Sequence, residues 1–214
     1  YALPQVVRDF RQHYPQVSLH LRQGSPRQVA EMLLSGEADI GVATEALAGY
    51  ERLVTLPCYR WSHSIVVPPG HALLQGSGPV TLQALARHPI ITYDTGYTGR
   101  AHIDEAFARA GLAPDIVLTA MDADVIKTYV ELGMGVGIVA SIALDAERDR
   151  HLHALDARHL FAVNLTRLGL RRGGWLRGYA YRFIETFVPT LTREAVQQAL
   201  QMPHPAAQDE QLAA

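Results

Sequence analysis

Apolar residues recur at helical spacing from the beginning of the chain. Leu3, Val6, Val7, Phe10 and Tyr14 fall on one face of a helix with 3.6 residues per turn, so the pattern predicts an amphipathic helix from the first of these residues to the last. No methionine opens the chain, and a natural terminus rarely begins inside such an element. We therefore expect the chain to be a piece of a longer protein.

The pattern then changes to alternation and returns to helical spacing. Alternating apolar residues predict a strand over Val17–Arg22. Ser25 opens a Ser-x-x-Gln capping box with a proline at the first helical position, and the helix that follows is predicted to end at Gly36. A short apolar run then predicts a buried strand over Asp39–Ala43.

The same order of elements returns further along the chain. Gly36 is followed by Glu-Ala-Asp-Ile-Gly-Val-Ala-Thr and Gly133 by Met-Gly-Val-Gly-Ile-Val-Ala-Ser, an offset of 133 − 36 = 97 residues. At this offset Ser25 falls on Asp122, and both residue types are favoured helix N-caps. The offset predicts that the chain contains a structural repeat.

The second half reads like the first. It is predicted to contain strands over Ile90–Tyr93, Asp115–Ala120 and Val136–Ala140, with helices over Arg100–Ala110 and from Asp122 to Gly133. Strands that alternate with helices imply parallel sheets covered by helices on both faces. The predicted fold class is therefore α/β, with two Rossmann-like lobes.

Further strands connect the two lobes. Leu53–Tyr59, Ser62–Pro68 and Thr166–Arg171 have strand composition, so we expect two crossovers, near Trp61 and near Thr166, that would form a hinge. Two C-terminal helices are expected to return to the first lobe. The first has an aromatic stripe of Tyr179, Phe183 and Phe187, and the second is predicted over Leu191–Met202. The predicted boundaries are residues 1–61 with 167–202 for lobe I, 62–166 for lobe II, and a disordered tail at 203–214.

Composition narrows the class of protein. Nineteen Lys and Arg stand against 21 Asp and Glu, and no basic stripe occurs, so this segment itself is not expected to bind nucleic acid. The single cysteine, Cys58, excludes an internal disulfide and suits a reducing compartment. No apolar run approaches the roughly 18 residues of a membrane span.

Candidate binding residues follow the predicted strands. Thr44 and its counterpart Ser141 each follow a strand, Ser25 follows another, and the loop Thr95–Arg100 follows a fourth. Ligands in open α/β sheets bind outside the carboxyl ends of the strands. Hydroxyl groups, glycines and helix N-termini there favour a small anion. The alternative interpretation of the loop is an ordinary turn with Thr98 as N-cap.

The repeat also locates missing parts of this site. The repeat places the counterpart of Thr98 at position 98 − 97 = 1. The counterpart of Thr95–Tyr97 would therefore precede Tyr1. We therefore expect some binding residues to lie upstream of this chain.

Other residues have two interpretations each. Trp61 could form a wall of the binding pocket or simply pack, and Arg100 could pair with a ligand carboxylate or be a solvated first-turn residue. His151 and His153 lack partners at metal-ligand spacing, so no metal is expected. No catalytic constellation or cofactor motif occurs, and we expect neither an enzyme nor a cofactor.

Several runs together resemble a known family. They look like the effector-binding domains of LysR-type transcription regulators, in the CysB-like branch that controls the cysteine regulon, over nearly the whole chain to about Leu200. The runs are Gln23-Gly-Ser-Pro-Arg-Gln28, Ala38-Asp-Ile-Gly-Val-Ala-Thr-Glu45, Leu56-Pro-Cys-Tyr-Arg-Trp61, Thr95-Gly-Tyr-Thr-Gly-Arg100 and Asp122-Ala-Asp-Val-Ile-Lys-Thr-Tyr129.

The resemblance implies a periplasmic-binding-protein-like fold of type II, with two crossovers between the lobes. It implies a cytoplasmic homo-oligomer, with this domain as a dimer and the full-length protein as a tetramer, that binds promoter DNA only through an N-terminal winged helix-turn-helix absent from this chain. It also implies control of sulfur assimilation and cysteine synthesis, with no membrane association.

The family also suggests the ligand and its contacts. An acetylated serine would be the inducer, opposed by sulfide or thiosulfate, and sulfate is a further candidate oxyanion. The resemblance implies binding between the lobes by Thr44 and Thr98, near Trp61. Taking both arguments together, the predicted ligand-binding residues are Thr44, Thr98, Trp61, Tyr97, Gly99 and Ser25, with Arg100 and Ser141 as further candidates.

Two alternatives remain from other classes of protein. An extracytoplasmic solute-binding protein for an anion or amino acid would have the same fold and cleft. An enzyme on this fold is a third possibility, although no base or nucleophile nominates a reaction. The residues upstream would separate the first two, because a helix-turn-helix indicates a regulator and a signal peptide a transporter component.

Overall fold

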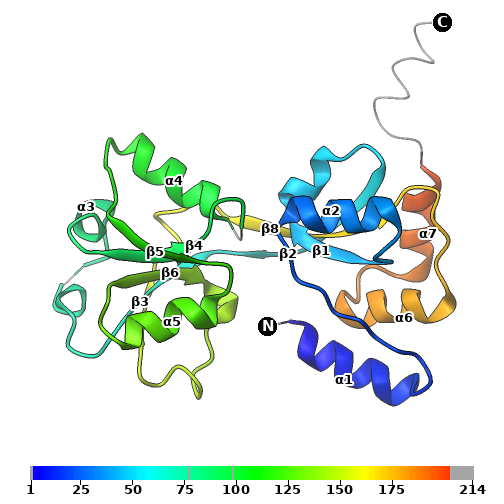
Figure 1. The fold of residues 1–214 in the computed structure, drawn as a ribbon, viewed down its shortest axis with the longest axis horizontal. Helices are drawn as coiled ribbons and strands as arrows, with labels where there is room; N and C mark the ends of the chain where they lie inside the picture. The colour runs from blue at the N-terminus through cyan, green and yellow to red at the C-terminus, as the bar shows by residue number, and fades with distance from the viewer. Residues whose placement is uncertain (1, 77, 98, 203–214) are drawn as a thin grey trace, which may run out of the picture. The chain divides into compact units, whose positions relative to one another are not determined.

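The computed structural model describes residues 2–76, 78–97 and 99–202, in two compact units (Figure 1). The first unit contains the residues up to Tyr59 together with those from Thr166 onward, and the second unit is Arg60–Leu165. The chain therefore passes between the units twice, after Tyr59 and after Leu165. The tail predicted to be disordered, residues 203–214, lies outside the described residues.

In the described residues the first unit combines a three-stranded sheet with four α-helices and one 3-10 helix. Its strands lie in the order β1-β8-β2, and β1 pairs antiparallel with β8. A parallel sheet was predicted here, and that prediction is wrong for this pair because β8 returns from the far end of the chain. The elements are α1 (Leu3–His13), α2 (Pro26–Ser35), β1 (Gly41–Thr44), the 3-10 helix η1 (Glu45–Gly49), β2 (Leu53–Trp61), β8 (Asn164–Arg171), α6 (Gly178–Phe187) and α7 (Arg193–Gln201). The last two residues of β2 and the first two of β8 belong to the second unit.

The second unit contains a five-stranded mixed sheet in the order β5-β4-β6-β3-β7. β4 pairs parallel with β5 and β6, as the repeat predicts, whereas β3 pairs antiparallel with β6 and β7. The elements are β3 (His63–Val67), η2 (Ala72–Leu74), α3 (Leu82–Leu85), β4 (Ile90–Tyr93), α4 (Arg100–Arg109), β5 (Ile116–Ala120), α5 (Ala123–Glu131), β6 (Val136–Ala140), η3 (Ser141–Ala143) and β7 (His153–Asp156).

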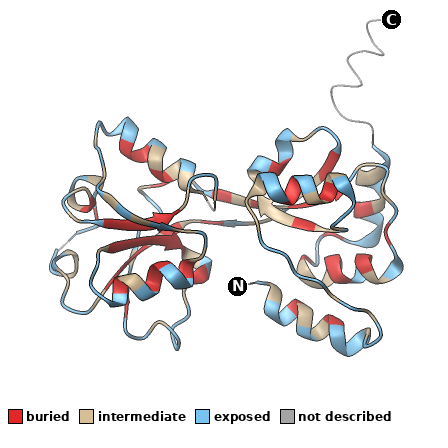
Figure 2. Ribbon diagram, viewed as in Figure 1, coloured by how far each residue is buried: buried red, intermediate tan, exposed pale blue. Residues whose placement is uncertain are grey.

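Two helices cover opposite faces of this sheet (Figure 1). Ile103 and Phe107 of α4 pack in one cluster with Ile65 of β3. On the other face, a Cβ added to Gly137 of β6 would meet α5 side chains at Val130 and Ile126. Figure 2 shows the resulting burial, with β4 and β6 buried along their whole lengths. A sheet covered on both faces has continuous apolar strands, which is why these two strands do not alternate.

The repeat offset is reproduced by the helices. α1 and α4 begin 100 − 3 = 97 residues apart, and α2 and α5 begin 123 − 26 = 97 residues apart. Ser25 and Asp122 both cap their helices, and Ser25 forms the complete capping box. Gly36 and Gly133 both follow their helices at positive φ, 80° and 74°, where a residue with a Cβ would be strained. These local predictions are confirmed.

One predicted strand is wrong. The residues of 17–22 form no strand in the described part of the chain, although Val17 and Leu19 are half-buried against the α1–α6 cluster. Leu21 is instead 64% exposed. Alternation reports which side of an extended segment is buried, but a strand also needs a hydrogen-bonded neighbour.

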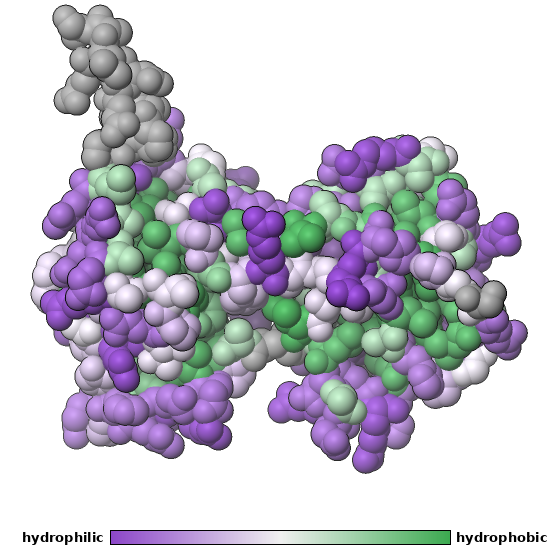
Figure 3. All heavy atoms as spheres, turned by 180° about the vertical axis from the view of Figure 1, so that it is seen from behind, coloured by the Kyte–Doolittle hydropathy of each residue, from purple (hydrophilic) through white to green (hydrophobic). Residues whose placement is uncertain are grey.

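The C-terminal helices pack in the first unit as the aromatic stripe predicts. The rings of Phe10 on α1 and Phe183 on α6 meet edge to face with centroids 5.4 Å apart. Tyr179 and Phe187 flank this contact from the same helix. Elsewhere the surface is mixed, and Figure 3 shows polar and apolar residues interspersed over the face it displays. No helix in the described residues is long and apolar enough to span a membrane.

Candidate functional site

The predicted binding residues of the second unit gather where its parallel strands end. β4 and β6 end at Tyr93 and Ala140, and the Ala140 N–H donates to the Tyr93 phenol oxygen at 2.9 Å. The Asp94 N–H donates to the Ala120 carbonyl at the end of β5, also at 2.9 Å. Because β3 runs antiparallel to β6, its first residue, His63, lies opposite Ala140 at the same edge.

Burial raises the pKa of Tyr93, and its phenol therefore stays protonated while it accepts the hydrogen bond from Ala140. Tyr93 is not among the binding residues predicted from the sequence. The sequence feature that could have indicated it is a tyrosine, which is aromatic and carries a hydroxyl, at the end of a predicted buried strand.

The loop between β4 and α4 is built on two glycines. Gly96 and Gly99 have φ of 83° and 69°, and Gly99 is the N-cap of α4. The alternative in which Thr98 caps this helix is therefore wrong. Thr98 itself, the main predicted ligand-binding residue, lies outside the described residues. Tyr97 is half-buried, and its carbonyl accepts the Arg100 N–H at 2.9 Å.

Arg100 braces this loop from inside the unit. Its side chain is 12% exposed, and its Nε donates to Asp104 at 2.7 Å. A second guanidinium nitrogen donates to the Tyr93 carbonyl at 2.7 Å. The prediction of a solvated first-turn residue is therefore wrong, and these contacts position the loop.

Next to Gly99 lies a group of buried polar and aromatic side chains, of which only Trp61 was predicted from the sequence. A Cβ added to Gly99 would lie 3.0 Å from His63 Cε1 and would overlap Asn164 Oδ1. The ring centroid of His63 is 5.2 Å from that of Trp61. Trp61 is 6% exposed, so packing is at least part of its role.

Ser141 lies beside Ser62 at the same edge. The Ser141 N–H donates to the Ser62 carbonyl at 2.8 Å, and the two hydroxyl oxygens are 3.5 Å apart. Ser141 is half-buried and begins η3. Thus Trp61, Tyr97, Gly99, Arg100 and Ser141 all belong to one edge of the second unit.

The remaining candidates belong to the first unit. Thr44 ends β1 opposite Thr166 of β8, and its side chain makes no capping hydrogen bond to the 3-10 helix that follows. The Ser25 hydroxyl accepts the Gln28 N–H at 3.3 Å, so its oxygen already serves the capping box. Burial raises the pKa of Tyr59, and a hydrogen bond with Thr166 opposes that rise.

Lys127 is a buried cation of the second unit. Lys127 of α5 donates to the Ala143 carbonyl at 2.9 Å and contacts Asp149 at 2.8 Å and Asp124 at 2.8 Å. Burial opposes its charge most strongly, but the hydrogen bonds to the two carboxylates raise its pKa overall. Lys127 thereby ties α5 to the segment after Ser141. In the described residues no group of three His, Cys, Asp or Glu is placed to hold a metal.

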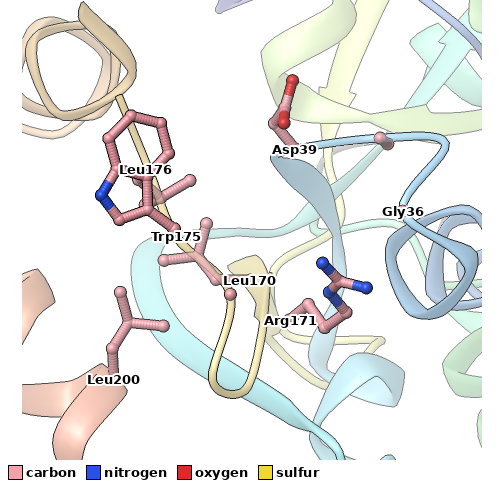
Figure 4. A pocket seen from close by; sticks show the side chains of 9 residues that line it. Gly36, Asp39, Leu170, Arg171, Trp175, Leu176 and Leu200 are labelled. Atoms are coloured by element: carbon pink, nitrogen blue, oxygen red, sulfur yellow. The ribbon is translucent and has the colours of Figure 1, made fainter. Parts of the chain in front are cut away.

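A small pocket lies elsewhere in the first unit, at the opposite end of β1 from Thr44 (Figure 4). Its volume is about 50 Å³, enough for a few water molecules. Arg171 and Asp39 face it from one side, and Trp175, Leu176 and Leu200 line the other. It contains none of the predicted binding residues.

Comparison with known proteins identifies the fold. The model of the LysR substrate binding domain matches residues 1–192. The solved cofactor-binding domain of the Cbl transcriptional regulator is 48% identical and superimposes with a TM-score of 0.87, over 94% of this chain and 89% of that one. The effector-binding domain of QuiR, solved with shikimate, is 16% identical with a TM-score of 0.74, which shows the fold alone. The predicted α/β fold of the type II periplasmic-binding-protein kind is confirmed.

Relatives of this chain are regulators. The transcriptional regulator SsuR of Burkholderia cenocepacia is 58% identical over 92% of this chain, and the regulator CysB of the same organism is 52% identical over 94%. The chain spans 63% and 64% of the length of these two relatives. Its identity over this length and the match of the domain model agree with the resemblance seen in the sequence. The chain belongs to the LysR substrate-binding domain family.

Proposed function

We propose that this chain is the effector-sensing domain of a LysR-type regulator of sulfur assimilation and cysteine biosynthesis. Its relatives carry the names SsuR, CysB and Cbl, and all three are named transcriptional regulators. We further propose that the full-length protein binds promoter DNA through an N-terminal domain, forms a homo-oligomer and acts in the cytoplasm.

The proposed ligand is a small anionic metabolite, with acetylserine, sulfate and thiosulfate as candidates. The observation that carries this proposal is the start of α4. Gly99 caps the helix without a side chain. In the first turn the Arg100 and His102 N–H groups donate to the Tyr97 and Gly99 carbonyls, so it is the positive end of the helix dipole, rather than a full set of free donors, that favours an anion there. The helix dipole adds about 0.3–1 kcal/mol for a negative charge at such an end.

The proposed contacts are the residues predicted from the sequence. Tyr97, Thr98 and Gly99 would provide the loop donors, with Trp61 and Ser141 beside them. Thr44 would provide a hydroxyl from the first unit, while Ser25 would contribute through α2, whose N-terminus it caps. Arg100 would position the loop, since Asp104 and the Tyr93 carbonyl already occupy its guanidinium.

The proposed mechanism is a shift between conformations of the protein. An effector changes an equilibrium only by its differential affinity for the two states. In an oligomer, that difference would alter the disposition of the DNA-binding domains. A metabolite that binds equally well to both states would have no regulatory effect.

Calorimetry tests the binding proposal. Acetylserine, sulfate and thiosulfate are titrated into this chain and into the longer protein that includes the upstream residues. We expect Thr44→Val and Thr98→Val to weaken binding roughly 10- to 100-fold each, because each removes a hydrogen bond to a charged group worth roughly 1.5–3 kcal/mol. Thr186→Val is the control, because the Thr186 hydroxyl is occupied by the Arg182 carbonyl on an exposed face of α6. Lack of binding of all three ligands by the longer protein would refute the proposal.

The alternative, an extracytoplasmic solute-binding protein, has the same fold. The regulator is favoured because relatives 46–58% identical to this chain are named transcriptional regulators. The upstream sequence decides between them, since a helix-turn-helix supports the regulator and a signal peptide supports the solute-binding protein.

A further inference from the structure

One buried acceptor in the second unit has no donor. Asn164 is fully buried, and its Oδ1 receives no hydrogen bond. The amide nitrogen of the same side chain donates to the Ala162 carbonyl at 3.5 Å, which supports the assignment of the two amide atoms. A buried acceptor without a hydrogen-bond donor lowers the stability of the fold, so such a group often has a functional role.

This acceptor lies directly beneath the start of α4. A Cβ added to Gly99 would overlap Oδ1 and would lie 2.9 Å from Asn164 Cγ. Gly99 is the N-cap of α4, a helix of ten residues. The unpaired oxygen is therefore adjacent to the helix N-terminus at which the anion is proposed to bind.

The surroundings of the acceptor are largely apolar. His63 is fully buried and meets Trp61 and Phe161 edge to face, with ring centroids 5.2 Å and 5.4 Å away. Trp61 and Phe161 are 6% and 4% exposed. A hydrogen bond in such a setting faces little competition from bulk water and is correspondingly strong.

We propose that Asn164 is a specificity-determining residue of the effector site. Its Oδ1 accepts an N–H or O–H of the ligand, while the anionic oxygens of the same ligand bind the first turn of α4. The inference rests on the proposed function, because it assumes that the anion binds there. Gly99 covers Oδ1 on this side, so the ligand donor reaches the acceptor when Gly99 moves away from it.

The consequence is a preference between classes of anion. A metabolite that carries an amide or hydroxyl donor next to its charge satisfies Asn164. A fully ionised oxyanion such as sulfate has no donor at neutral pH and leaves the acceptor unpaired. Sites with buried polar groups reject analogues that lack the matching group more strongly than apolar pockets reject an extra one.

The test is the isosteric change Asn164→Leu in the protein that includes the upstream residues. N-acetylserine, which carries an amide N–H and a hydroxyl, and inorganic sulfate are the two probes. The ratio of the sulfate Kd to the N-acetylserine Kd is expected to fall about tenfold, while the thermal midpoint does not fall, because the change removes an unsatisfied acceptor. A purely structural Asn164 would show the reverse, a lower midpoint and an unchanged ratio.

Thr92→Val is the matched control. Thr92 is also a fully buried polar residue of the second unit, and its hydroxyl donates to the Ile138 carbonyl at 3.1 Å. Its loss is expected to lower the midpoint and to leave the ratio of the two dissociation constants unchanged. An equal change of the ratio in both variants would overturn the inference.

A direct measurement keeps the inference testable if the leucine variant does not fold. Asn164 is the single asparagine of this chain, so with selective 15N labelling of asparagine the spectrum of this chain identifies its side-chain amide, and any other asparagine signal of the longer protein comes from the upstream residues. Saturation with N-acetylserine is expected to shift this signal, and sulfate to shift it less. Binding of both probes with no shift overturns the inference alone, whereas no binding of either probe overturns it together with the proposed function.

Discussion

Gly99→Ala probes the contact at the start of α4 most directly. Two costs add at this position. An L-residue in the left-handed region at φ 69° costs roughly 1–2 kcal/mol. The new Cβ would also overlap Asn164 Oδ1 and lie 3.0 Å from His63 Cε1. Overpacking of this kind costs about 1–3 kcal/mol more.

Gly111→Ala separates the two costs. Gly111 has φ 65°, close to that of Gly99, but a Cβ there meets nothing within 4 Å. Its variant is therefore expected to bear only the conformational cost. The difference between the two variants isolates the steric contact.

Chemical and thermal unfolding of the two variants measure this difference. For a chain of this size, 1 kcal/mol shifts the midpoint by about 2–4 °C, so Gly99→Ala is expected to melt roughly 2–12 °C below Gly111→Ala. Combining Gly99→Ala with Asn164→Ala is expected to recover part of that gap. Equal midpoints for both single variants would refute the packing of Gly99 on Asn164.

Three further predictions concern stability and reactivity. Lys127→Met is expected to cost about 3–5 kcal/mol, because it leaves Asp149, whose side chain is 12% exposed, without its cation. Arg27→Met removes the exposed Arg27–Glu31 pair and should leave the urea midpoint nearly unchanged, so similar midpoints for the two variants would contradict this prediction. Ser25→Ala is expected to cost roughly 1 kcal/mol by removing the cap of α2, and unfolding that is unaffected would show that the capping box contributes nothing. Burial raises the pKa of the Cys58 thiol to about 11, so its labelling rate should keep rising with pH beyond 9, where an exposed cysteine levels off; a plateau near 9 would contradict the burial. The same shift predicts that stability from the buried neutral thiol is lost as pH rises from about 9 towards 11, because ionisation is easier in the unfolded chain.

Local chemistry made the helices predictable. The capping box at Ser25, the cap at Asp122 and the glycines after both helices act within a few residues, so their effects can be read from spacing alone. The offset of 97 residues then predicted the helices of the second half from those of the first half. The same local rules identified the loop before α4 as a candidate anion site.

Pairing was less predictable than local structure. The segment 17–22 alternates like a strand but has no strand partner in the described residues, and β8 joins β1 in antiparallel register. Both outcomes depend on which distant segment lies alongside. Alternation of apolar and polar residues predicts which face of a segment is buried, but it does not predict which strand lies beside it.

The sequence by itself determined the α/β class, the caps of α2 and α5, and the repeat. Only the tertiary structure placed Asn164 and His63 against Gly99, at separations of 164 − 99 = 65 and 99 − 63 = 36 residues. It also showed that Asp104 and Tyr93 occupy Arg100. The physical reason is that turn and cap energies act between neighbouring residues, whereas burial and contact with a distant side chain exist only once the sheet and its helices have packed.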